Sequence, residues 1–173
     1  MAYSIEKGIS ESDLKKWLKQ ASKELPSFKD GRINYTKAKI APIIMCTLVF
    51  SGKILLAKRG YGLADAEGVW STINGFIDED KSITAFAIQE VLEEIGLKIK
   101  PQQVKVADSY TLSNPQEKRN YIVFPCLIKL TSKPTIKLDR EHTTYTWIER
   151  QELEHYETLD DLPYAVDAAL APN

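Results

Sequence analysis

The sequence has no apolar segment long enough to cross a membrane. Its longest apolar run, from Ile40 to Phe50, covers about half of the length that a membrane-spanning helix needs, and Pro42 and Thr47 interrupt it. The N-terminal residues MAYSIEKGISESDLKK also lack the apolar stretch of a secretory signal. We therefore expect a cytoplasmic protein without a membrane partner.

Charge of one sign and cysteine are also scarce. The chain has 23 Lys and Arg against 24 Asp and Glu, a net charge of −1. A protein that binds duplex nucleic acid or an anionic membrane usually carries an excess of positive charge, so neither is expected as a partner. The two cysteines, Cys46 and Cys126, lie in apolar, strand-like segments. This context predicts free buried thiols, not a disulfide, a metal pair or a nucleophile.

The composition is that of one globular domain. Of 173 residues, 43% are hydrophobic and 27% are charged, which excludes a largely disordered or fibrous chain. Residues 1–39 are predicted to form an N-terminal helical extension, because residues 10–25 have apolar side chains on one helical face and Pro26 ends the pattern.

The rest of the chain, residues 40–173, alternates between predicted strands and helices. Extended segments are expected at 40–50, 53–59, 71–78, 104–112, 120–130 and 143–149. Helices are expected at 82–96, 149–156 and 159–171. Strands on both sides of one central helix, followed by a C-terminal helix, indicate an α/β fold with a mixed sheet between helices.

The helix at 82–96 has three glutamates on one face. Glu90, Glu93 and Glu94 have the spacing i, i+3, i+4, which brings their side chains together opposite the apolar face. Clustered carboxylates suit Mg²⁺ or Mn²⁺. The alternative is an acidic face exposed to water, which the spacing alone favours, so the surrounding residues decide.

Those residues resemble a known motif. The segment from Gly75 to Leu97, GFIDEDKSITAFAIQEVLEEIGL, is similar to the Nudix box: glycine, five residues, glutamate, seven residues, arginine-glutamate, an aliphatic residue, any residue, two glutamates, any residue, glycine and an aliphatic residue. The matching positions are Gly75, Glu90, Val91, Glu93, Glu94, Gly96 and Leu97. The resemblance implies a Nudix-type α/β/α sandwich with a mixed β-sheet, and it leaves residues 1–39 outside.

Two positions depart from the box. Lys81 stands at the first glutamate of the motif and Gln89 at its arginine, while Asn74 precedes Gly75 where many members of the family have a second glycine. In the family the first glutamate and the arginine support the helix and its carboxylates. We therefore expect Lys81 and Gln89 to support the site, with Lys81 paired to a glutamate or to Asp78.

The resemblance also implies a chemistry. It predicts a Nudix-type pyrophosphohydrolase that cleaves a phosphoanhydride bond in a nucleotide or nucleotide sugar, using Mg²⁺ or Mn²⁺ held by Glu90, Glu93 and Glu94. Either Glu90 or Glu141 would act as general base. Arg59, Asn74 and Gly75 are the expected substrate contacts. The alternative for Arg59 is solvation at the end of its strand, and the alternative for Glu141 is a solvated loop residue. The expected partner is a nucleotide-type small molecule, and a homodimer is compatible with the sequence.

Further residues have competing interpretations. Tyr61, Trp70 and Tyr110 are candidates for stacking on a nucleobase, although Trp70 is expected mainly to pack before the box. His142 and His155 are expected to be exposed in loops. Substrate specificity is expected to depend on loops 60–69 and 112–119.

Two alternatives to a hydrolase remain on the same fold. The altered Lys81 and Gln89 favour a non-catalytic module that binds or senses a nucleotide. An isomerase of prenyl diphosphates would need a cysteine paired with a carboxylate at the site, and the two cysteines are expected in strands elsewhere.

Overall fold

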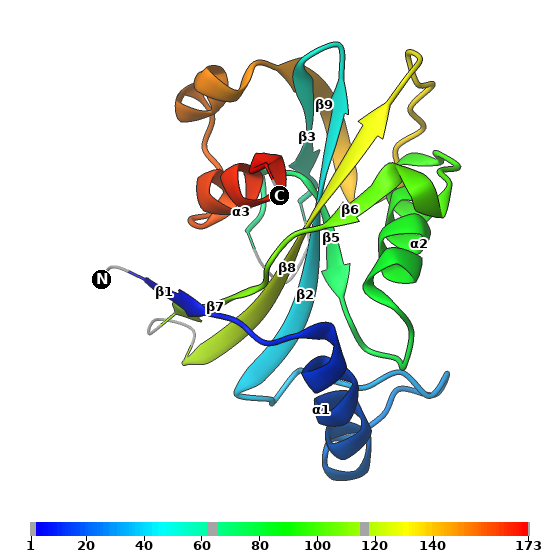
Figure 1. The fold of residues 1–173 in the computed structure, drawn as a ribbon, viewed down its shortest axis with the longest axis vertical. Helices are drawn as coiled ribbons and strands as arrows, with labels where there is room; N and C mark the ends of the chain where they lie inside the picture. Colours follow the sequence, from blue (N-terminus) through cyan, green and yellow to red (C-terminus); the bar gives the residue numbers. More distant parts are fainter. Residues whose placement is uncertain (1–2, 62–65, 115–117, 173) are drawn as a thin grey trace.

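The computed structural model describes residues 3–61, 66–114 and 118–172. Within these residues nine strands form one sheet, and three α-helices cover its two faces (Figure 1). The helices are α1 (Glu11–Glu24), α2 (Ile83–Ile95) and α3 (Leu162–Leu170), with short 3₁₀ turns at Pro101–Gln103 and Arg150–His155. The strands are β1 (Ser4–Lys7), β2 (Ile40–Phe50), β3 (Lys53–Arg59), β4 (Trp70–Ser71), β5 (Ile73–Phe76), β6 (Val104–Val106), β7 (Tyr110–Asn114), β8 (Arg119–Leu130) and β9 (His142–Ile148).

The sheet is mixed, as expected. Its main path is β1-β7-β8-β2-β3-β4, with β5 paired to β2, β6 to β8 and β9 to β3. Strands β2 and β8 are parallel over their whole paired length, from Ile40 opposite Asn120 to Phe50 opposite Leu130. The other strand pairs are antiparallel. This parallel pair forms the centre of the sheet.

The alternation of side chains along β2 divides the core into two layers. Ile44, Cys46 and Leu48 face the cluster that contains α1 and α2, whereas Met45 faces the cluster that contains α3. Helices α1 and α2 accordingly lie on one side of the sheet and α3 on the other (Figure 1). The predicted α/β/α sandwich is confirmed.

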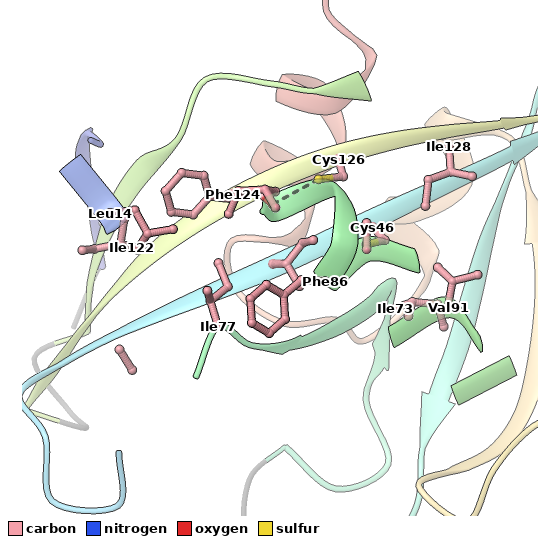
Figure 2. Packing of buried hydrophobic residues seen from close by; sticks show 14 of the residues in the cluster. Leu14, Cys46, Ile73, Ile77, Phe86, Val91, Ile122, Phe124, Cys126 and Ile128 are labelled. Atoms are coloured by element: carbon pink, nitrogen blue, oxygen red, sulfur yellow. Dashed lines mark hydrogen bonds between the residues drawn. The ribbon is translucent and has the colours of Figure 1, made fainter. Parts of the chain in front are cut away.

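Helix α2 begins and ends where its sequence predicts. The Ser82 hydroxyl accepts a hydrogen bond from Ala85 N at 3.2 Å, and Gly96 ends the helix with φ of 67°, a left-handed conformation that glycine adopts at little cost. Phe86 and Val91 on its inner face join side chains of α1, β2, β5 and β8 in one cluster (Figure 2). This packing fixes which face of α2 is turned away from the sheet.

The N-terminal segment shares that cluster. Leu14, Leu18 and Ala21 of α1 are buried in it, together with Ile33 and Tyr35 from the connection that follows. Strand β1, which the sequence analysis missed, lies beside β7 at the sheet edge (Figure 1). Residues 3–39 therefore contribute both a strand and a buried helical face to the sandwich.

Other elements differ in detail from the predictions. The extended segment expected at 104–112 is divided into β6 and β7, and the helix expected at 159–171 begins only at Leu162. Cys46 and Cys126 are free and buried, as predicted. Within the described ranges, no helix is long and apolar enough to cross a membrane.

Candidate active site

The three glutamates of α2 have different environments. Glu94 is buried, with 6% of its surface exposed, Glu90 is half-buried and Glu93 is exposed. Glu90 and Glu94 therefore lie closer to the sheet than Glu93, which is open to solvent. The three glutamates share one face as predicted, but their exposure to solvent increases from Glu94 through Glu90 to Glu93.

Gly75 makes room for the Glu90 carboxylate. A Cβ atom at Gly75 would lie 2.5 and 2.6 Å from the two carboxylate oxygens of Glu90, closer than non-bonded atoms tolerate. Gly75 belongs to β5 and is paired with Ile44 of β2, so its backbone is fixed in the sheet. The missing side chain therefore lets Glu90 rest directly on the β5 backbone. The expected contact of Gly75 with substrate stays a prediction.

Burial and like charges make the ionised carboxylates costly. Burial first, and then Glu93, Asp78 and Glu141, raise the pKa of Glu90 to about 7. The pKa of Glu94 is also raised, first by burial and then by Glu90, Glu141 and Asp139. Because the charge of Glu141 contributes to the raised pKa of both Glu90 and Glu94, this loop residue lies toward the acidic face of α2.

His142 is a neighbour of Glu94, and the expectation that it lies exposed in a loop is wrong. It is the first residue of β9, whose side chains alternate between the two faces, and only 6% of it is exposed. Its Nε2 lies 3.5 Å from Glu94 Oε2, and its Nδ1 lies 3.2 Å from Asp139 Oδ1. His155 has an exposed side chain, as expected.

The buried atoms of this pair point to a cation site. Within the described residues, Glu94 Oε2 and His142 Nε2 have no hydrogen-bond partner. A divalent cation would satisfy such an oxygen and relieve the repulsion between Glu90 and Glu94. In the same residues, no three carboxylate, imidazole or thiol groups are already gathered into a complete metal site. The carboxylate oxygens are thus of the type that Mg²⁺ or Mn²⁺ prefers, and Glu93 is the one most exposed to solvent.

Lys81 and Gln89 form a short chain of hydrogen bonds beside the glutamates. The Lys81 ammonium donates to Glu79 Oε1 and to Gln89 Oε1, each at 3.1 Å. The Gln89 amide in turn donates to Glu93 Oε1 at 3.0 Å. Lys81 does pair with a glutamate, as expected, but with Glu79 and not with Asp78. The two residues that depart from the box therefore contact each other and orient Glu93.

The partner of Asp78 comes from the N-terminal segment, and sequence analysis missed it. Arg32 Nη1 lies 3.5 Å from Asp78 Oδ2. Asp78 is buried, which raises its pKa, and Arg32 acts in the opposite direction. Nothing in the local pattern around Arg32 indicates this contact, because its partner is more than forty residues away.

Arg59 is the last residue of β3, and Glu141 directly precedes β9, which pairs with β3. The backbone N–H of Gly60, which follows β3, donates to the Glu141 carbonyl at 2.7 Å. The Arg59 charge opposes the rise in the pKa of Glu94. Asn74 uses its amide to donate to Ser71 Oγ and to the Thr72 carbonyl, at 2.9 and 3.0 Å. The expected substrate contacts of Arg59 and Asn74 stay predictions.

The aromatic candidates separate clearly. Tyr110 is 2% exposed and donates to Asp161 Oδ2 at 2.6 Å, so it is not available to stack on a nucleobase. Trp70 packs edge-on against Tyr156 with ring centroids 5.3 Å apart, which confirms its packing role. Tyr61 is 81% exposed. Residues 62–65 and 115–117 of the two loops expected to set specificity lie outside the described residues.

Comparison with known proteins gives a consistent picture. A family model described as the NUDIX domain matches residues 40–168. No curated protein matches the sequence. Among solved structures, the MutT protein of Methanosarcina mazei Go1 is 20% identical, with a TM-score of 0.62 over 76% of this chain and 95% of that one. An Ap4A hydrolase from C. elegans is 17% identical, with a TM-score of 0.57 over 76% and 94% of the two chains.

One similar structure extends further along the chain. A bifunctional NMN adenylyltransferase/ADP ribose pyrophosphatase from Francisella tularensis, in complex with AMP and a Mn ion, is 19% identical with a TM-score of 0.57. The match covers 90% of this chain and 45% of that one. Residues 1–39 make up more than a tenth of this chain, so this match includes part of them.

Proposed function

The chain belongs to the NUDIX domain family, and on this basis we propose that it is a metal-dependent hydrolase of a phosphoanhydride bond in a nucleoside diphosphate linked to another group. The observation that carries the proposal is the Glu90 carboxylate resting on Gly75 beside buried Glu94. A structure that only needed a stable helix would gain nothing from two repelling carboxylates there.

The proposed ligands of Mg²⁺ or Mn²⁺ are Glu90, Glu93 and Glu94. When bound, the metal would neutralise charge on the diphosphate and lower the pKa of a water molecule that attacks phosphorus. His142 lies 3.5 Å from Glu94 on its buried side, and the hydrogen bonds from Lys81 through Gln89 support Glu93. In this way the two altered box residues keep a supporting role.

A carboxylate at this site would remove the proton of the attacking water. Glu90 is the first candidate, because its carboxylate rests on Gly75 at the centre of the acidic face. Glu141 is the second, because its charge contributes to the raised pKa of both Glu90 and Glu94 and it lies on a loop held to Gly60. We propose that Arg59 contacts a phosphate group through its planar guanidinium.

The substrate class is tested with a panel of phosphoanhydrides. We expect turnover with Mg²⁺ or Mn²⁺ of ADP-ribose, a nucleotide sugar or a dinucleoside polyphosphate, the first and third being named for similar proteins. Nucleoside triphosphates complete the panel, and product identification locates the cleaved bond. Addition of EDTA should abolish turnover, and excess Mg²⁺ should restore it.

The departures at Lys81 and Gln89 favour one alternative, a module that binds a nucleotide without cleaving it. Isothermal titration with the same compounds separates the two. Tight binding of one compound together with no turnover of any would establish the binding module and refute the hydrolase.

A further inference from the structure

One cation of the site comes from outside the box. Arg32 lies in the connection between α1 and β2, and its guanidinium spans two carboxylates: Nε is 2.9 Å from Asp30 Oδ2, and Nη1 is 3.5 Å from Asp78 Oδ2. Asp78 lies in the segment that joins β5 to α2, between Gly75 and Glu90 in sequence. The Arg32 charge is close enough to Glu90 to oppose the rise in the pKa of that residue.

The backbone around Arg32 is fastened to the same segment. Ile33 N donates to the Asp78 carbonyl at 3.0 Å, and the buried Tyr35 hydroxyl donates to the Ile77 carbonyl at 2.7 Å. Ile33 also forms a bridge with Ser27, which closes a short turn around Arg32. These contacts fix the backbone of Arg32 beside the segment that joins β5 to α2.

Two other cationic side chains, Lys81 and Arg59, lie near glutamates other than Glu90. Lys81 is held between Glu79 and Gln89 on the Glu93 side of α2. Arg59 acts on Glu94. Arg32 thus acts on Glu90 and Arg59 on Glu94, and we call the part of the site around Arg32, Asp78 and Glu90 the Glu90 side.

The Arg32 side chain is available for such a contact. It is 47% exposed, and its nearest partner, Asp30, is 53% exposed. Exposed ion pairs contribute little to stability, whereas guanidinium-to-phosphate hydrogen bonds are charge-assisted and can be bidentate. A phosphate group can therefore replace Asp30 as the partner of Arg32.

We infer that Arg32 is a substrate-binding residue that holds a phosphate group of the diphosphate on the Glu90 side of the site. The inference rests on the substrate class of the proposed function. It assigns part of the substrate site to the N-terminal segment, and it explains how a box without its arginine has a guanidinium beside its glutamates.

Binding of a nucleoside diphosphate that resists cleavage tests the inference. The probe is α,β-methylene-ADP, titrated calorimetrically into the full chain in the presence of Mn²⁺. We expect Arg32→Gln to weaken its binding by about 10-fold, because a charge-assisted pair is lost. Arg32→Lys, which keeps the charge without the planar fork, should recover part of the affinity. Binding of Mn²⁺ alone, followed by electron paramagnetic resonance, should change by less than about 2-fold in both variants.

Arg150→Gln is the matched control. Arg150 forms an ion pair with Asp167 at 2.7 Å, in contact with α3 on the other side of the sheet. Its loss should leave binding of the probe unchanged.

The inference is overturned if the wild-type chain does not bind the probe, or if wild type and Arg32→Gln bind it with equal affinity. It is also overturned if Arg32→Gln weakens binding of Mn²⁺ as much as binding of the probe, because that would show a structural role. The assay needs no turnover. A chain that hydrolyses nothing but needs Arg32 for binding refutes the hydrolase alone, and a chain that hydrolyses its substrate with a KM independent of Arg32 refutes this inference alone.

Discussion

The contact between Gly75 and Glu90 shows how one missing side chain positions one carboxylate. The Cα of Gly75 is fixed because β5 is paired with β2, so an added methyl group could not move away. Glu90 is the flexible partner and would have to leave. The glycine is required here by close approach, and not by a left-handed backbone conformation.

We predict that Gly75→Ala lowers kcat by about 10²-fold, because displacement of a reacting group by about 1 Å has an effect of this size. Steady-state kinetics measures the loss. The double variant with Glu90→Gln should lose no more than Glu90→Gln alone, since both changes remove the same carboxylate from its place. Additive losses would show that Gly75 acts independently of Glu90.

We predict that Glu90→Gln lowers kcat by ~10²–10⁴-fold, the effect of removing a general base. The variant keeps the size of the side chain and removes a charge that burial and Glu93 disfavour. Its Tm, measured without metal by calorimetry, should therefore equal or exceed that of the wild type.

Glu141→Gln, made in parallel, identifies the base. With both rates measured at saturating Mn²⁺, the variant that loses more rate marks the residue that takes the proton. A full wild-type rate in both variants would contradict a carboxylate base at this site.

At the scale of elements, α3 is joined to β7 by a buried polar pair on the far side of the sheet. The Tyr110 hydroxyl donates to Asp161, which precedes α3 and is 4% exposed. Burial raises the pKa of Asp161 above its usual value, and the hydrogen bond from Tyr110 only partly opposes this. The folded chain therefore binds the proton of Asp161 more tightly than the unfolded chain does.

This pair predicts a pH dependence of stability. Protonated Asp161 makes its full contribution to the stability of the fold at pH values below the unfolded pKa near 3.8. That contribution is lost as pH rises through the folded pKa and the buried carboxyl ionises. Asp161→Asn keeps an acceptor for Tyr110 but cannot ionise. Its free energy of unfolding should thus exceed that of the wild type at pH 7, with the difference shrinking as pH falls toward 4.

Urea unfolding at several pH values measures this difference. Tyr110→Phe is the control, because it leaves Asp161 buried without its donor and should cost about 1–3 kcal/mol. A wild type more stable than Asp161→Asn at pH 7 would contradict the prediction.

The elements also show which signals a single sequence contains. Helix α2 could be predicted to the residue because Ser82, Gly96 and the spacing of its glutamates are local signals. Strand β1 could not, because its four residues form a strand only beside β7, about a hundred residues later in the chain. The contacts of His142 with Glu94 and of Arg32 with Asp78 were missed for the same reason: each depends on how distant segments pack.

For the whole molecule, the shared core means that the N-terminal segment stabilises the layer that contains α2. Leu18 of α1 is buried in the same cluster as Phe86 and Val91 of α2. A change in α1 therefore affects the element that presents the glutamates, although the two are far apart in sequence.

We predict that Leu18→Ala lowers the free energy of unfolding by about 2–5 kcal/mol, as expected for a large side chain removed from a packed core. Denaturant unfolding should show one transition for both proteins. The control Lys19→Ala, at the adjacent exposed position, should change stability by less than about 0.5 kcal/mol. A separate early transition for the N-terminal segment would contradict a shared core.

The central parallel pair has a consequence for synthesis of the chain. Ile40 of β2 is paired with Asn120 of β8, so the chain must grow by eighty residues beyond Ile40 before this pair can form. At about 5–20 residues per second, β2 waits roughly 4–16 s on the ribosome for its partner. In the finished sheet β3 and β5 pair with one edge of β2 and β8 with the other, so until β8 is made this second edge has no native partner. The slow closure of this long loop makes the arrival of β8 the event that commits the newly made chain to its native sheet.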